Sequence, residues 1–350
     1  MSKIKVNSLE GVGASTPAIS IDNASGTCTA NLTNRQGKNL VVNGACLIAQ
    51  RGVDATGLAA NTYATVDRFK ATQSGTDEYI EQHQVDVSSG TTPYTLGFRK
   101  AFQVKNGNQS SGAEAGDSIS MSYLIEDQDL ATSGWNYLSS SSYITLSFWF
   151  KSSVNQTFYV ILESKDGTSR QYSFAITPTG ADTWTKVTHI IPGNSGLQFS
   201  NDNGEGIEIY FALFYGTNLT TSSHTLNTWK TTSASDQAPD MTSTWFTTND
   251  ATFEITGVQL EVGNATDFEH RSFAQELALC QRYFEKTSMY ISNAPYPFIY
   301  QREKRAAATV TSPDAGGTFG LAGVTPSSTS MWVIRSGGGG NYTVHMDAEL

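Results

Sequence analysis

The sequence has little charge, few cysteines and no long apolar run. Only 15% of the 350 residues are charged, and there are three cysteines, far apart and in no metal-binding spacing. No segment approaches the roughly 20 consecutive apolar residues that a membrane-spanning helix needs, and residues 1–5 (MSKIK) lack the apolar core of a signal peptide. We therefore expect a protein made in a reducing cytosol, with Cys28, Cys46 and Cys280 as free thiols and no membrane insertion.

The charge that is present is mostly acidic. The formal net charge is −10. A surface of that sign repels the phosphate backbone, so nucleic acid is not expected as a ligand. The charge does not argue against neutral glycans.

Long runs of Ala, Leu, Glu and Lys are also nearly absent, whereas Ser, Thr, Gly, Asn and aromatic residues are abundant. Hydroxylated, β-branched and aromatic side chains suit pleated strands, and Gly, Asn and Asp suit the turns between them. Between residues 39 and 263 apolar and polar residues alternate in segment after segment, as in 143–150, 170–176, 184–190, 207–214 and 251–260. Such a pattern predicts an all-β fold with a sandwich or barrel.

One segment follows a helical period instead. Phe273, Leu277, Cys280 and Phe284 recur on one face of a 3.6-residue helix, and Ser272 with Gln275 forms a capping-box pattern at its start. The sequence therefore predicts four parts: an N-terminal arm (1–40), a β-sandwich domain (41–271), a connecting helix (272–285) and a C-terminal β unit (286–350).

The two end parts are poor in large apolar residues. The C-terminal unit alone would be only marginally stable, and assembly into a homotrimer would bury the additional apolar surface that it needs. The arm has isolated apolar residues among Gly, Ser, Thr and Asn, a composition that fits either a disordered tail or an arm that docks on another protein by adding short strands. For docking, the candidate residues are Ile4, Val6, Leu9, Ile19 and Ile21.

No local motif indicates catalysis. The chain has no GxSxG elbow, HExxH pair or phosphate loop. A glycosidase needs two carboxylates placed across a glycosidic bond, and no motif selects such a pair here. We expect a protein that is not an enzyme, with a polysaccharide depolymerase as the enzymatic alternative, because carboxylate pairs assemble in three dimensions.

Exposed aromatic rings would mark a sugar site, since the CH faces of sugars pack on rings. Four aromatic residues in polar, loop-like contexts are the candidates: Trp135, Tyr137, Trp229 and Trp245. The alternative is that each closes the core or fills a trimer interface. Trp149 and Trp184 lie in alternating strands and are predicted to be core residues.

Two acidic clusters are candidate metal sites. Glu126, Asp127 and Asp129 lie together in sequence, and Asp202 with Glu205 is a second possibility. Calcium prefers oxygen ligands of this kind, but neither cluster has the full spacing of a calcium loop, so solvated loops are the alternative. No other cofactor is expected.

Four stretches together are similar to proteins of a known group. They are residues 39–52 (NLVVNGACLIAQRG), 63–69 (YATVDRF), 257–272 with GVQLEVG and FEHRS, and 276–284 (ELALCQRYF). Together they resemble tail-fibre and related appendage proteins of tailed bacteriophages, in particular phages of marine bacteria. The resemblance covers most of the chain from residue 39 onward.

The resemblance implies a jelly-roll sandwich similar to carbohydrate-binding modules, homotrimeric assembly and an N-terminal anchor on the virion. The expected function is that of a tail-fibre component that attaches to other tail proteins through the arm and contacts a glycan or protein of the host surface. Two alternatives remain: a purely structural head-fibre, decoration or scaffold protein, and the depolymerase. The resemblance does not identify ligand residues.

Overall fold

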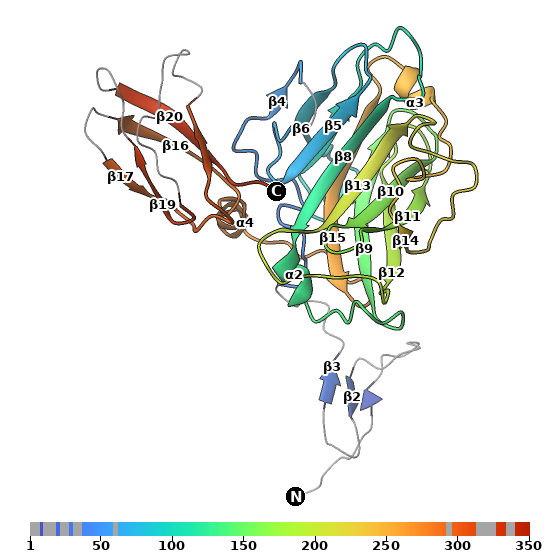
Figure 1. Ribbon diagram of the computed structural model, residues 1–350, viewed down its shortest axis with the longest axis horizontal. Helices are drawn as coiled ribbons and strands as arrows, with labels where there is room; N and C mark the ends of the chain where they lie inside the picture. Colours follow the sequence, from blue (N-terminus) through green and yellow to red (C-terminus); the bar gives the residue numbers. More distant parts are fainter. Residues whose placement is uncertain are drawn as a thin grey trace, which may run out of the picture.

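The computed structural model describes residues 8–9, 19–21, 28–30, 37–58, 62–291, 296–312, 327–333 and 340–350. Figure 1 shows a large β-sandwich, a smaller β unit beside it and a group of short strands near the N-terminus. All strand pairs within the described sheets are antiparallel. The predicted all-β sandwich is therefore confirmed.

The first sheet of the sandwich has six strands. Their order is β14-β11-β10-β13-β8-β5, with the bounds β5 Phe69–Ser74, β8 Ser118–Glu126, β10 Phe158–Ser164, β11 Arg170–Ile176, β13 Glu205–Tyr215 and β14 Lys230–Thr231.

The second sheet also has six strands. Their order is β12-β9-β15-β7-β6-β4, with the bounds β4 Asp54–Ala55, β6 Glu81–Asp86, β7 Lys100–Lys105, β9 Tyr143–Ser152, β12 Thr185–Pro192 and β15 Thr252–Val262. The late strand β15 lies between the earlier strands β7 and β9, as in Greek-key connections.

The core lies between the two sheets and follows the period of two. On β9 the side chains of Ile144, Leu146, Phe148 and Phe150 point inward and are almost fully buried. Phe148 meets Phe211 of the first sheet edge to face, with ring centroids 5.1 Å apart. Burying each such side chain stabilises the fold by roughly 1.5–3 kcal/mol.

The C-terminal unit is a smaller pair of sheets with its own buried cluster. One sheet has the order β16-β20-β18 and the other pairs β17 with β19. The bounds are β16 Phe284–Ile291, β17 Tyr296–Ile299, β18 Thr309–Thr311, β19 Ser330–Val333 and β20 Gly340–Asp347. Its buried cluster contains few large side chains: Ile291, Tyr300, Ala308, Met331, Val344, Met346 and Ala348.

Near the N-terminus, three short strands form a separate sheet of order β1-β2-β3. Its strands are β1 Ser8–Leu9, β2 Ile19–Ile21 and β3 Cys28–Ala30. Three of the proposed docking residues, Leu9, Ile19 and Ile21, lie in β1 and β2. The other two, Ile4 and Val6, lie outside the described residues.

Four helices occur among the described residues, and three of them are very short: α1 Thr92–Thr95, α2 Asp127–Ala131 and α3 Thr244–Thr247. The fourth, α4 (Phe273–Cys280), begins at the predicted cap, since Ser272 and Gln275 form a complete capping box. None of the described helices is long and apolar enough to cross a bilayer.

The predicted length and buried face of α4 are wrong. The helix ends at Cys280, and Phe284 already begins β16. Phe273 is 61% exposed, whereas Glu276 and Cys280 are buried against the sandwich. The polar Glu276 replaces the expected apolar contact because its carboxylate accepts a hydrogen bond from the backbone of Asn43. Cys280 and Cys46 are both free and buried.

Candidate functional site

Two of the four predicted sugar-binding aromatics belong to the core. Trp245 is fully buried and donates its indole N–H to the carbonyl of Thr252 at 3.1 Å. Trp135 is 3% exposed and packs against Tyr137 and Phe199. For these two rings the alternative interpretation holds, that each closes the core, because short segments around them, including α3, fold over the ends of the sandwich (Figure 1).

The other two are partly buried at the margin of the core. Tyr137 meets Phe199 edge to face at 4.7 Å. Trp229 lies beside Tyr172 at 5.5 Å and donates its indole N–H to the carbonyl of Pro192 at 2.6 Å. Both rings have structural contacts, and a role in ligand binding stays a prediction.

The three carboxylates of the first acidic cluster, those of Glu126, Asp127 and Asp129, do not come together at one position. Glu126 forms a two-pronged ion pair with Arg282 at 2.7 and 2.8 Å. Asp127 is buried and accepts hydrogen bonds from the backbone of Asn201 and Asp202, while Asp129 is exposed. The predicted calcium site is thus not formed, and in the described part of the chain no three His, Cys, Asp or Glu side chains gather as a metal site.

The second acidic possibility is a turn. Asp202 accepts a hydrogen bond from the backbone N–H of Gly204 at 2.6 Å, and Glu205 is exposed at the start of β13. Burial and the neighbouring Asp166 carboxylate raise the pKa of Asp127 to about 6. These carboxylates hold the loop before β13 against α2.

Two half-buried aromatic residues, Trp149 and Trp184, lie on the outer face of the second sheet, although they were predicted to be core residues. Trp149 shares the outward face of β9 with Ser147 and Lys151, since Phe148 and Phe150 point inward. Trp149 is half-buried and lies directly opposite Lys186 of β12. Trp184 precedes β12 and carries the ammonium of Lys151 over its ring at 5.4 Å. Trp149 and Trp184 thus lie outside the core between the two sheets, where they were predicted, and instead pack, partly buried, on a smaller cluster that contains Phe98 and Val87.

Beside Trp149 the outer face of the second sheet is hollowed into a groove of about 280 Å³. We call it the Trp149 groove. Its lining includes Leu96, Phe98, Trp149, Lys186, Asp267 and Phe268. Phe98 and Phe268 meet edge to face, with ring centroids 4.9 Å apart. Phe98 is only 2% exposed, so the rings that a ligand can reach are those of Trp149 and Phe268, which are half-buried. Ring faces with a few polar groups around them are typical of small-molecule sites.

A glycine and a bulge shape the floor of this groove. The register between β15 and β9 shifts between Thr256 and Gln259, and Gly257 has a positive φ of 63°. A Cβ at Gly257 would lie 2.6 Å from the ring of Phe98. The close packing of Phe98 on the sheet therefore depends on glycine at this position.

The polar groups of the groove are of both signs. Among the described residues, neither Lys186 nor the carboxylate of Asp267 takes part in an ion pair. Lys186 can donate hydrogen bonds and Asp267 can accept them. The pair suits a ligand that carries hydroxyl groups, which donate and accept.

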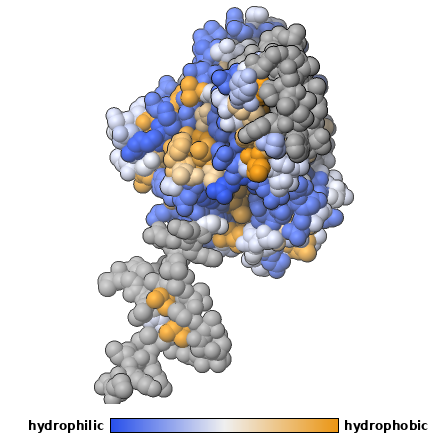
Figure 2. Space-filling view, turned by 90° about the vertical axis from the view of Figure 1, so that its left-hand side faces the viewer, coloured by the Kyte–Doolittle hydropathy of each residue, from blue (hydrophilic) through white to orange (hydrophobic). Residues whose placement is uncertain are grey.

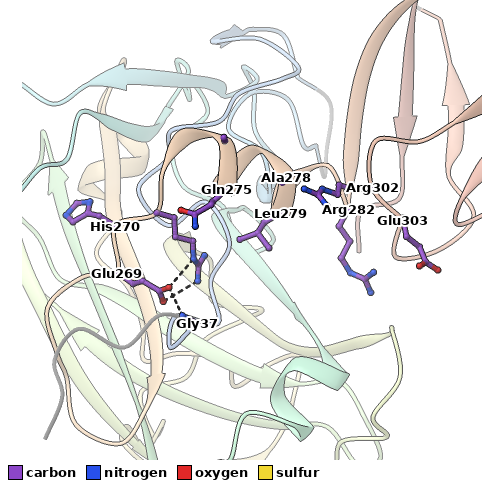
Figure 3. A pocket seen from close by; sticks show the side chains of 11 residues that line it. Gly37, Glu269, His270, Gln275, Ala278, Leu279, Arg282, Arg302 and Glu303 are labelled. Carbon is purple, nitrogen blue, oxygen red and sulfur yellow. Dashed lines mark hydrogen bonds and ion pairs between the residues drawn. The ribbon is translucent and has the colours of Figure 1, made fainter.

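A second hollow of about 930 Å³ lies along α4 and is wide open (Figure 3). Its lining includes Ala274, Ala278 and Leu279 of the helix. Glu269 is occupied, because its carboxylate accepts hydrogen bonds from Gly37 and Arg271. In the described part of the chain, His270 is the only aromatic or imidazole ring that lines it, so it offers less to a sugar than the Trp149 groove does.

The outer face of the first sheet is partly covered. Residues 216–243 fold over it, and Ala238 packs with Ile161 and Ala212 in a buried cluster. Ser173 of β11 is hydrogen-bonded to His224 of this segment, with Oγ and Nε2 2.5 Å apart, and His224 in turn to Asp236, with Nδ1 and Oδ1 2.7 Å apart.

The same three residue types act as nucleophile, base and orienting acid in hydrolases. Here Ser173 and His224 cannot be reached by a substrate, because Ser173 is 1% exposed and the side chain of His224 is fully buried. The ammonium of Lys230 also lies 2.9 Å from Nδ1 of His224. We interpret these hydrogen bonds as contacts that hold residues 216–243 against the sheet.

Comparisons with known proteins bear on the fold alone. No protein-family profile and no curated protein matches the sequence. Among solved structures, the chain is similar to the enzymatically active domain of tailspike protein 4 of bacteriophage CBA120, with 14% identity and a TM-score of 0.36. The match covers 64% of this chain but only 21% of that one.

Two binding modules are similar over nearly their whole length. A family 11 carbohydrate-binding module of a Clostridium thermocellum cellulosomal cellulase gives 14% identity and a TM-score of 0.28, covering 62% of this chain and 99% of that one. The N-terminal cellulose-binding domain of Cellulomonas fimi β-1,4-glucanase C gives 11% identity and a TM-score of 0.29, covering 62% and 99%. The predicted jelly-roll-like fold is confirmed. Similarities this low support no conclusion about function.

Proposed function

We propose that this protein is an adhesive component of a bacteriophage virion, of the tail-fibre type, and that it binds a host-surface glycan through the Trp149 groove. The observation that carries the proposal is the half-buried Trp149 ring, set among Phe98, Phe268, Lys186 and Asp267 in one hollow. Ring faces pack against sugar CH groups, and the two charged side chains exchange hydrogen bonds with hydroxyl groups.

The attachment to a virion rests on the sequence resemblance of residues 39–52, 257–272 and 276–284 to phage appendage proteins. In the proposed assembly the arm attaches to other tail proteins and three chains associate. The C-terminal unit supports self-association, since its buried cluster is small and it exposes Tyr290 and Ile299 by 61% and 75%. Figure 2, which views the side of this unit, shows separate hydrophobic patches among hydrophilic surface.

The proposed action is binding without cleavage. Adhesion by several weak sites on one particle gains strength from their high effective concentration. No step of bond breaking is assigned to any residue of the groove.

The test is a screen of immobilised glycans with the purified full chain, followed by calorimetry on those that bind. Trp149→Ala should reduce the affinity at least tenfold, and Leu138→Ala should leave it unchanged, because Leu138 is an exposed apolar residue outside the groove. Chromatography of the bound oligosaccharides should show no shortened products. If Trp149→Ala binds as the wild type does, the groove is not the site, and shortened products would support the depolymerase.

A further inference from the structure

A row of polar side chains crosses five strands of the second sheet next to the Trp149 groove. Directly paired positions link Lys151 to Glu254, Glu254 to Gln103, Gln103 to His83 and His83 to Asp54. These positions run over β9, β15, β7, β6 and β4. We call them the polar row.

The side chains of the polar row lie on the outer face of the sheet. Their neighbours along the strands, such as Phe150, Phe253, Phe102 and Val104, point into the core, and alternation places the row on the other side. Side-chain contacts form two groups along the row. Glu254 accepts from Gln103 at 2.8 Å and pairs with Lys151 at 3.0 Å, and separately His83 meets Asp54 at 2.8 Å.

The row begins where the groove ends. Lys151 follows Trp149 by two residues on the same face of β9, a step of about 6.8 Å along the strand. Trp184 stands under Lys151 and adds a ring at this junction. From β9 to β4 the row crosses four strand intervals of about 4.8 Å, or about 19 Å in all.

The row offers alternating donors and acceptors but no spare positive charge. Lys151 is paired with Glu254, and Lys105, beside the row, is paired with Asp250 and Glu81. His83 contacts Glu81 as well as Asp54. Among the described residues that line the groove, the one ammonium, of Lys186, and the one carboxylate, of Asp267, share the lining without forming an ion pair, so their formal charges sum to zero. A polyanionic saccharide would therefore meet more carboxylates than free cations, in a chain whose net charge is −10.

We infer that the ligand is an uncharged, extended glycan chain that lies across the strands, with one sugar ring on Trp149 in the groove and the following rings along Lys151, Glu254, Gln103 and His83. This inference rests on the proposed glycan binding at the Trp149 groove and adds its length, direction and charge class. Lys151, Gln103 and His83 exchange hydrogen bonds with successive hydroxyl groups, while Glu254, which is 5% exposed, holds Lys151 and Gln103 in place.

The experiment is calorimetric titration of the full chain with linear, neutral oligosaccharides of glucose, mannose and galactose, from the monosaccharide upward, and with uronic-acid oligosaccharides of the same lengths. The affinity of the wild type for at least one neutral series should rise with chain length until the row is covered. Gln103→Ala should leave the affinity for the shortest bound sugar unchanged and lower the affinity for the longest about tenfold. A loss of this size is expected when the hydrogen bonds between the amide and the sugar hydroxyl groups are removed.

Matched variants separate the groove from the row. Trp149→Ala should weaken short and long oligosaccharides alike, and Leu138→Ala should weaken neither. His83→Ala is a second row variant, on β6 next to the edge strand β4, and it leaves no buried charge behind because its partners Asp54 and Glu81 are accessible to solvent. Circular dichroism checks that each variant is folded.

Each outcome has a distinct meaning. If the affinity does not depend on oligosaccharide length and Trp149→Ala still binds more weakly, the row does not contact the ligand, while the groove remains the binding site. Tighter binding of the uronic-acid series overturns the charge class. Unchanged length dependence in both Gln103→Ala and His83→Ala also overturns the row. If no oligosaccharide binds, the proposed function fails and this inference fails with it.

Discussion

The guanidinium of Arg68 and the carboxylate of Glu349 form an ion pair inside the protein, although 281 residues separate them in the chain. The Arg68 side chain is 1% exposed and the Glu349 side chain 4%. Arg68 also lies over the ring of Tyr283 at 3.4 Å and donates to the carbonyl of Leu124. The pair joins the last residues of the C-terminal unit to the sandwich.

Replacing Glu349 with glutamine should destabilise the protein strongly, because it leaves the buried charge of Arg68 without the carboxylate that neutralises it. Removing one member of a buried pair costs about 3–5 kcal/mol. Urea unfolding at neutral pH measures the loss. The matched control is Asp86→Asn, since Asp86 pairs with Lys100 at the surface and an exposed pair is worth about 0–1 kcal/mol. Equal losses in the two variants would contradict the importance of the Arg68 pair.

Acid should weaken the fold through His189. Burial lowers the pKa of His189 below 6.5, and its ring stacks on Phe174 with centroids 3.8 Å apart. The unfolded chain takes up this proton near pH 6.5, while the folded chain resists it. The contribution of neutral His189 to the free energy of unfolding is therefore present above pH 6.5 and is lost as the pH falls below it.

His189→Phe isolates this effect, because phenylalanine keeps the stacking and cannot titrate. The stability of the variant relative to the wild type should rise as the pH falls from 7.5 to 5. The comparison cancels opposing groups such as Asp67, whose pKa burial raises to about 6. A difference that stays constant over this range would show that His189 does not control the acid response.

Gly257→Ala should disturb both stability and binding. A left-handed conformation costs an alanine about 1–2 kcal/mol, and the added Cβ would also meet the ring of Phe98 at 2.6 Å. Displacement of Phe98 should deform the Trp149 groove and weaken glycan binding. Gly263→Ala is the control, because Gly263 also has a positive φ but has no heavy atom within 4 Å of the Cβ position. Identical behaviour of the two variants would argue against a role of Phe98 in shaping the groove.

His224→Ala should loosen residues 216–243. The imidazole links Ser173 of β11 to Asp236 of the covering segment. Without it, trypsin should cut after Lys230 in the folded protein at least several times faster than in the wild type, since cleavage follows the population of the locally open form. Mass spectrometry of the fragments locates the cut. His83→Ala serves as control, and equal rates in all three proteins would mean that the covering segment is held by other contacts.

Ile299→Ser should change the state of association and not the fold. Ile299 is 75% exposed in the single chain, so the substitution removes no internal contact of weight. Light scattering after gel filtration should give a trimer for the wild type and smaller species for the variant. Ile190→Ser, which alters an exposed isoleucine of β12, should remain a trimer. A monomeric wild type would refute the proposed assembly.

Local patterns predicted the strands and the start of α4 well. Alternation identified β9, β11, β12, β13 and β15, and Ser272 with Gln275 marked the helix start, because each signal lies within a few residues of the feature it controls. The end of α4 was missed because Arg282 leaves the helix to pair with Glu126, a contact that only the folded chain creates.

The aromatic residues show where sequence reasoning failed and where it need not have. Trp149 is two residues from both Ser147 and Lys151 on β9 and therefore lies on the same face of the strand. Alternation alone thus indicated that its ring points outward. Trp135 and Trp245 lie in segments without a period, and only the tertiary structure shows that they close the core. The chain of Ser173, His224 and Asp236 had no local signal at all.

The position of β15 between β7 and β9 has a consequence for the order of events in folding. The neighbours of β15 are formed from residues far earlier in the chain, and closing such long loops makes β-sandwiches slow to fold, in the range of milliseconds to seconds. Trp149 of β9 and Gly257 of β15 become neighbours only when this insertion occurs. During refolding, the capacity to bind a ligand in the groove should therefore return in a single late phase, after most of the strand structure has formed.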